Sequence, residues 1–158
     1  MSNLLHEMKS LYAAGNYDGA LALIERMERE GLLYPEVFLW KGRCLQLGDG
    51  RHFRDISEIE QLYRRALDID DEYVPALMEL GWFYLNVMDD AGRARPFFDR
   101  AFGLLREALT EAVEGVARCL WETDTKYAAA AYLTLVTHNL LDQTQIRQLK
   151  DEIKADGP

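Results

Sequence analysis

The sequence is poor in the residues that mark several classes of protein. It holds only four prolines and two cysteines, and no stretch approaches the roughly 18 to 20 consecutive apolar residues that cross a membrane. The start shows no basic region followed by a long apolar run, so no secretory signal is visible and the cytoplasm is the expected compartment. A chain of 158 residues that is 49% hydrophobic should instead bury one core, as a single domain over residues 1–158.

Basic residues are also scarce. The chain has 18 lysines and arginines against 27 acidic residues, which gives a formal net charge of −9. A negative field repels nucleic acid and anionic membrane, so we expect neither as a partner and favour a neutral or basic protein. The same charge would also serve simply to keep a helical protein in solution.

Residues with catalytic or metal-binding chemistry are few and scattered. The three histidines, His6, His52 and His138, lack the spacing that places two metal ligands on one helix face. The two cysteines, Cys44 and Cys119, each lie inside a helical pattern, which is typical of reduced, packed thiols. The glycines are spaced as turns and packing points rather than as a phosphate loop. We therefore expect no enzyme activity, no metal and no cofactor.

The clearest pattern in the chain is a pair of apolar runs within residues 73–105, separated by Asp89, Asp90 and Gly92. Both runs have helical spacing, so this stretch predicts an antiparallel helix pair with a turn between its helices. Small residues on both runs would let the two helices approach closely. The first run comprises Ala76, Leu77, Leu80, Gly81 and Tyr84, and the second comprises Ala94, Phe97, Phe98, Ala101, Phe102 and Leu105.

The same pattern recurs along the chain. It predicts repeats over about residues 2–33, 35–70, 73–106 and 108–139, followed by a last helix over 142–155. Residues 48–55 form the longest connection, and Ser57 with Glu60 gives a weak capping signal for the helix that follows. A small or apolar residue opens each second helix at intervals of about 35 to 39 residues, namely Ala20, Ile59, Ala94 and Ala130.

Several of these segments resemble the tetratricopeptide repeat. They are GNYDGA at 15–20, FLWKG at 38–42 with RRAL at 64–67, and ALMELGWFY at 76–84 with ARPFFDRAF at 94–102. The resemblance implies an all-α solenoid of about four antiparallel helix pairs, wound as a right-handed superhelix and ended by a C-terminal capping helix. The match is weakest in the last pair, where a divergent helical pair is the alternative.

In that family the first helix of each pair lines the concave groove. The resemblance therefore implies that a partner binds residues of the first helices that packing does not need, and aromatic and arginine anchors are typical of such surfaces. The alternative is that Trp40 and Trp82 fold back over neighbouring helices, because large aromatic side chains are usually mostly buried. The expected groove residues are Leu5, Lys9, Tyr12, Leu39, Trp40, Arg43, Met78, Glu79, Trp82, Asn86, Arg118 and Trp121.

Three hypotheses for function follow. The first is an adaptor or chaperone-like module that holds a peptide or helix of a partner protein in its groove. The second is an acidic immunity-type or inhibitor protein that neutralises a basic partner such as a toxin domain, and it predicts strong salt dependence. The third is that the apolar stripe is a self-association surface that forms a homodimer.

Overall fold

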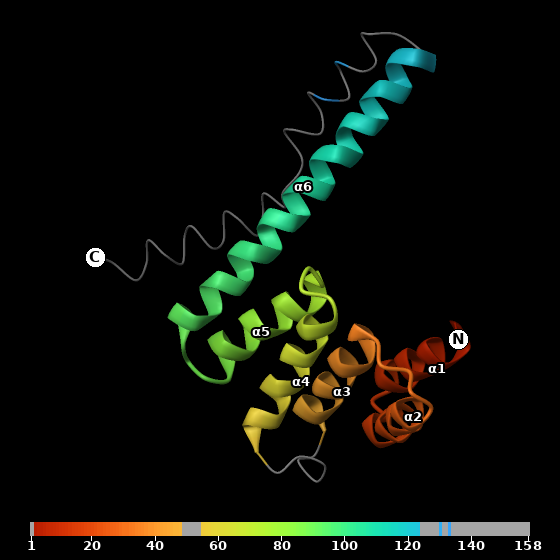
Figure 1. The fold of residues 1–158 in the computed structure, drawn as a ribbon, viewed down its shortest axis with the longest axis vertical. Coiled ribbons are helices and arrows are strands. Elements are labelled where there is room, and N and C mark those ends of the chain that lie inside the picture. The colour runs from red at the N-terminus through yellow and green to blue at the C-terminus, as the bar shows by residue number, and fades with distance from the viewer. Residues whose placement is uncertain (1, 49–54, 124–129, 131–132, 134–158) are drawn as a thin grey trace. The chain divides into compact units, whose positions relative to one another are not determined.

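The structure is a computed structural model that describes residues 2–48, 55–123, 130 and 133. Within this part of the chain the secondary structure is entirely helical, which confirms the all-α prediction (Figure 1). None of the helices in the described residues is long and apolar enough to cross a membrane. The helices are α1 (Ser2–Ala13), α2 (Tyr17–Arg29), α3 (Pro35–Leu47), α4 (Ile56–Ile69), α5 (Val74–Asn86) and α6 (Ala91–Thr123).

The chain divides into two compact units, Met1–Leu105 and Arg106–Pro158. The first unit contains α1 to α5 and the N-terminal part of α6, and the second contains the remainder of α6. The single domain expected over residues 1–158 stays a prediction.

Helices that are neighbours in sequence pack together in the first unit. α1 packs on α2, α2 on α3, α3 on α4, and α4 on α5, while α3 also contacts α5. The connections α1–α2, α2–α3 and α4–α5 are short, as expected for antiparallel neighbours, and Gly15 and Gly31 take the left-handed backbone conformation that ends α1 and α2 (φ 72° and 75°). The helix pairs predicted over residues 2–33 and 35–70 correspond to α1 with α2 and α3 with α4.

Two glycines let the helices of a pair approach closely. A Cβ atom at Gly42 of α3 would lie 2.5 Å from Cε1 of Tyr63 on α4, and one at Gly81 of α5 would lie 2.6 Å from Cε1 of Phe98 on α6. Each glycine therefore receives an aromatic ring of the partner helix. The small residues predicted to permit close packing do so at both positions.

The core of the first unit is built from the inward stripes of α1 to α6. It contains no buried charged or polar residue among the described residues. Its largest fully buried side chains are Tyr63, Tyr84, Phe38, Phe83, Met8, Ile24, Met27, Leu39, Ile59, Leu77, Leu80 and Val37.

Local signals set where several helices begin. The side chain of Asn16 accepts a hydrogen bond from the backbone N–H of Gly19 at the start of α2, and Pro35 occupies the first turn of α3. At α4 the cap is Asp55, whose carboxylate accepts from the N–H of Ser57 at 3.1 Å. The capping signal predicted at Ser57 and Glu60 is therefore wrong by two residues, because Asp55 occupies the cap.

The boundary predicted between the third and fourth repeats is wrong. The sequence pattern ends one helix near residue 106 and starts another at 108, whereas α6 continues without a break through 33 residues, Ala91–Thr123. The segment GLLREALT at 103–110 contains neither proline nor a turn signal, and most of its residues are good helix formers. Repeat spacing suggested a turn there that the local sequence does not encode.

Some residues predicted to pack are exposed. Phe102 and Leu105 of α6 lie at the surface rather than in the core, and Cys119 is exposed whereas Cys44 is buried. Neither cysteine forms a disulfide, as predicted. The second helix of the fourth pair, the capping helix over 142–155, and most of the 48–55 connection lie outside the described residues.

Candidate functional site

Aromatic and cationic side chains form a continuous row across α1 and α3. The ring of Tyr12 on α1 meets the ring of Trp40 on α3 edge-on, with ring centroids 4.8 Å apart, and Tyr17 flanks Tyr12 at 5.5 Å. The guanidinium carbon of Arg43 lies 4.7 Å from the Trp40 ring centroid, and the ammonium of Lys9 lies 5.9 Å from it. Trp40 is therefore held by an aromatic edge and two cations.

An ion pair extends this row to α5. Arg43 donates from Nε to Oε1 of Glu79 at 2.8 Å, and its Nη2 donates to the same oxygen. Both side chains are partly shielded from solvent. The row of Tyr12, Trp40, Arg43 and Glu79, called the ladder below, thus joins the first helices of three successive pairs.

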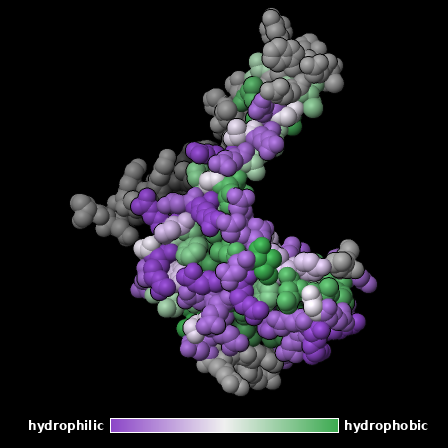
Figure 2. Space-filling model, viewed as in Figure 1, coloured by the Kyte–Doolittle hydropathy of each residue, from purple (hydrophilic) through white to green (hydrophobic). Residues whose placement is uncertain are grey.

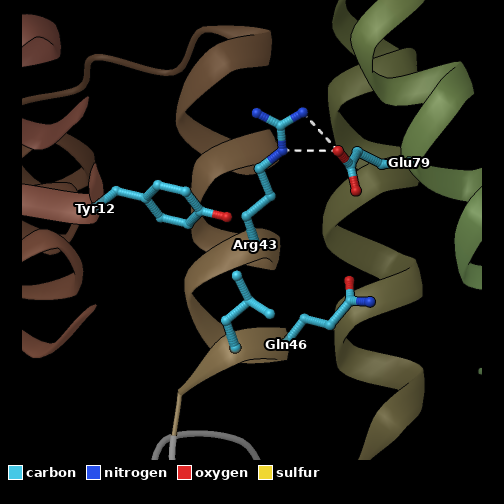
Figure 3. A pocket seen from close by; sticks show the side chains of 5 residues that line it. Tyr12, Arg43, Gln46 and Glu79 are labelled. Atoms are coloured by element: carbon cyan, nitrogen blue, oxygen red, sulfur yellow. Dashed lines mark hydrogen bonds and ion pairs between the residues drawn. The ribbon is translucent and has the colours of Figure 1, made fainter. Parts of the chain in front are cut away.

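A shallow hollow lies beside the ladder (Figure 3). It measures about 260 Å³, and its lining residues come from α1, α3 and α5. The hydroxyl of Tyr63 on α4 donates a hydrogen bond to Oε1 of Gln46 at 2.9 Å, which fixes the position of the Gln46 amide. The hollow is lined by Tyr12, Arg43, Gln46, Leu47 and Glu79.

Burial raises the pKa of two phenols in this region above their ordinary value. It raises the pKa of Tyr12, although the charge of Arg43 acts in the opposite direction. Burial likewise raises the pKa of Tyr63, which lies beneath Gln46. The surface therefore offers neutral hydroxyl and amide groups beside one internally paired arginine and carboxylate.

Five of the ten groove residues predicted on α1, α3 and α5 lie in the ladder or against it, namely Lys9, Tyr12, Trp40, Arg43 and Glu79. Lys9 is exposed, and Leu5 and Trp40 are half-buried against the core. Leu39 is an exception, because it is 2% exposed and belongs to the core. Its helix, α3, is contacted by α2, α4 and α5, so few of its side chains remain at the surface.

Trp82 lies on α5 toward α6. Its ring meets Phe98 edge-on with centroids 5.0 Å apart, and 47% of its surface remains exposed. Met78 and Asn86 stand one helical turn before and after it on the same face, half-buried and exposed respectively. The alternative of Trp40 and Trp82 folding over neighbouring helices therefore holds in part, since both rings contact an adjacent helix while Trp82 also faces solvent.

Two predicted groove residues cannot be placed on this surface. Arg118 and Trp121 fall within α6, but their side chains lie outside the described residues. Apolar side chains reach the surface of the molecule at several other places among polar ones (Figure 2).

Sequence reasoning missed a polar cluster that joins α4, α5 and α6. The buried Tyr84 donates its hydroxyl to Glu60, and the same hydroxyl accepts from Nη2 of Arg64 at 2.8 Å and from Nη2 of Arg93 at 2.9 Å. Burial alone would raise the pKa of Glu60, but the hydrogen bonds from Tyr84 and Arg64 and the charge of Arg93 hold it below its ordinary value. Only the i, i+4 spacing of Glu60 and Arg64 announces this cluster in the sequence.

The described residues offer little else with site chemistry. None of them forms a group of three or more histidine, cysteine or acidic side chains able to hold a metal ion. Burial raises the pKa of the Cys44 thiol to about 11, so it remains protonated and poorly reactive. A second hollow of about 210 Å³ lies among Leu33, Phe38, Arg65, Asp68 and Ile69.

No family model matches the sequence, and no curated protein matches it. The likeness to the tetratricopeptide repeat stays a prediction that depends on the residues quoted for it.

Proposed function

We propose that this protein is a protein-interaction module that holds a segment of a partner protein on the ladder surface of α1, α3 and α5. The observation that carries the proposal is the ladder itself, in which aromatic and arginine side chains of α1 and α3 and a glutamate of α5 form one partly exposed row. Such side chains dominate the binding energy of protein interfaces when they are partly preordered.

The wider architecture belongs to the same proposal. Sequential packing of α1 to α5 supports a tetratricopeptide-like solenoid, wound as a right-handed superhelix with the ladder on its concave side. In this arrangement the hollow beside Arg43 receives a peptide or helix of the partner, and Trp82 extends the same surface along α5. The role is that of an adaptor or chaperone-like module, with no catalytic step.

The first test is capture of partners from the native host by the full chain and by two variants. Arg43→Ala removes the ladder cation, and Trp82→Ala removes the exposed aromatic. A client that binds the ladder surface should be lost or weakened more than about 10-fold, because truncation of an anchor costs about 2 kcal/mol or more.

Arg26→Ala is the matched control. Arg26 also forms an ion pair with a glutamate, Glu30 at 2.9 Å, but both side chains are exposed on α2. The control should retain every client, and all variants should keep the wild-type circular dichroism. Identical capture by wild type, Arg43→Ala and Trp82→Ala would remove the ladder from the proposal.

The net charge of −9 favours a second candidate, an immunity-type or inhibitor protein that neutralises a basic partner. Long-range attraction between exposed charges is screened over about 8 Å at physiological salt. The association rate of such a complex should therefore fall steeply between low and high salt. A rate that does not change with salt would contradict this candidate and leave the ladder-based one intact.

A further inference from the structure

The hollow beside the ladder has a size that suits one side chain of a partner. Its volume of about 260 Å³ lies below the roughly 300 to 1,000 Å³ of pockets that enclose small-molecule ligands. Its wall is mixed, because Leu47 and the ring of Tyr12 are apolar while Arg43, Gln46 and Glu79 carry polar groups. The chemistry of those polar groups decides which side chain the hollow accepts.

Gln46 supplies the donor side of the hollow. Its amide oxygen Oε1 already accepts the hydrogen bond from the hydroxyl of Tyr63, at 2.9 Å. Tyr63 is fully buried, so this bond holds the Gln46 amide in one orientation from inside the helix stack. The part of a carboxamide that remains is its NH₂ group, which carries two hydrogen-bond donors. Gln46 therefore offers N–H groups to a ligand.

Glu79 supplies the acceptor side. Nε and Nη2 of Arg43 both donate to Oε1 of Glu79, so the ion pair does not use the second carboxylate oxygen, Oε2. Figure 3 shows this second oxygen pointing toward the Gln46 amide, with the hollow around them. An ionised carboxylate only accepts hydrogen bonds. The hollow thus has a donor and an acceptor that face one another from α3 and α5.

The charges that line the hollow cancel. Arg43 and Glu79 contribute one positive and one negative charge, and their side chains expose only 27% and 21% of their surface. A cation would be attracted by Glu79 and repelled by Arg43, and an anion would meet the reverse. Either would lose hydration without gaining a net attraction, and a charge shielded from water without its own partner is costly. The hollow therefore favours a neutral group.

We propose that this hollow binds the carboxamide side chain of an asparagine or glutamine in the partner's segment. The inference rests on the proposed function and names the anchor that the ladder surface recognises. The carboxamide oxygen accepts from the Gln46 amide, and the carboxamide NH₂ donates to the second oxygen of Glu79. A serine or threonine hydroxyl places its donor and its acceptor on one atom, whereas a carboxamide has them on separate atoms that can face different walls.

A library of random linear peptides displayed on phage, selected against the full chain, tests the proposal. The retained peptides should share an asparagine or glutamine at one position. In synthetic versions, replacing that residue by alanine, glutamate or lysine should weaken binding by about 10-fold or more, measured by fluorescence anisotropy. The reason is that Gln46 and Glu79 would lose water without gaining a hydrogen-bond partner.

Gln46→Glu tests the donor side directly. Glutamate keeps the length of the side chain and an oxygen for the Tyr63 hydroxyl, but it replaces the NH₂ group by a second acceptor and adds a negative charge. The variant should bind the selected peptides about 10-fold or more weakly. Lysine in place of the shared asparagine or glutamine should restore binding to the variant, because two carboxylates would then face the ligand.

Gln61→Glu is the matched control. It makes the same chemical change at an exposed position of α4 that does not line the hollow. It should leave both the affinity and the preference for asparagine or glutamine unchanged, and both variants should keep the wild-type circular dichroism. An equal loss in this control would show that added negative charge alone weakens binding, and would count against the proposal.

The outcomes separate this inference from the proposed function. Peptides that bind wild type but not Arg43→Ala, and that share no asparagine or glutamine or tolerate its replacement, would overturn the carboxamide anchor and leave the proposed function standing. An unchanged preference in Gln46→Glu would overturn the anchor as well. If wild type retained no peptide more strongly than Arg43→Ala does, both the anchor and the proposed function would be overturned.

Discussion

At the scale of single residues, the fold depends on the positions of its glycines as much as on the positions of its large side chains. Gly42 and Gly81 each receive an aromatic ring from the paired helix, whereas Gly103 has nothing within 4 Å of its Cβ position. The first two glycines are thus required by packing, and Gly103 only weakens its helix. The difference between them can be measured.

We expect Gly42→Ala to destabilise the protein by about 1 to 3 kcal/mol, since its methyl group would overlap the ring of the fully buried Tyr63. Gly103→Ala should instead stabilise it by up to about 1 kcal/mol, because alanine is the better helix former and meets no neighbour. Urea unfolding followed by circular dichroism gives both values. A neutral Gly42→Ala would show that Tyr63 can move aside and that the contact does not fix the pair.

At the scale of helices, the sequence predicts which face of each helix is buried better than it predicts where the helix begins and ends. The apolar spacing located α1 to α5 and the small residues between paired helices, because burial dictates both. Helix ends depend on single side chains and on the absence of stop signals. α6 continues through the predicted turn at 106–108 because repeat length, rather than any local residue, suggested that turn.

The start of α4 gives a direct test of a helix end. Asp55→Ala removes the carboxylate that accepts from the N–H of Ser57, and should cost about 1 kcal/mol of stability. Ser57→Ala should change stability by no more than a few tenths of a kcal/mol, because the hydroxyl of Ser57 is not the cap in the structure. If thermal unfolding showed equal losses of stability in the two variants, Ser57 would be the cap after all.

At the scale of the whole molecule, the contacts between helices that are distant in sequence could not be predicted from the sequence. The surface residues of the first helices could be predicted from the repeat pattern, and they included all four members of the ladder. It could not show that Arg43 stacks on Trp40 and pairs with Glu79, or that Leu39 is buried. Those facts depend on how α1, α3 and α5 are spaced, which apolar periodicity does not encode.

The cluster around Tyr84 ties three helices together, so its titration should appear in the global stability. The pKa of Glu60 is lowered on folding from an ordinary value of 4.5, which means that the folded state favours its ionised form. The resulting stability is present above about pH 4.5 and is lost as the pH falls through that value toward the lower folded pKa.

Glu60→Gln keeps an oxygen for the Tyr84 hydroxyl but removes the charge. The variant should be less stable than wild type at pH 7 in urea unfolding, and the gap should close as the pH falls below about 4.5. Glu25→Gln, at an exposed position of α2, is the matched control for the removal of one negative charge. A gap for Glu60→Gln that stays constant between pH 7 and pH 3 would mean that the glutamate holds the three helices by its shape rather than by its charge.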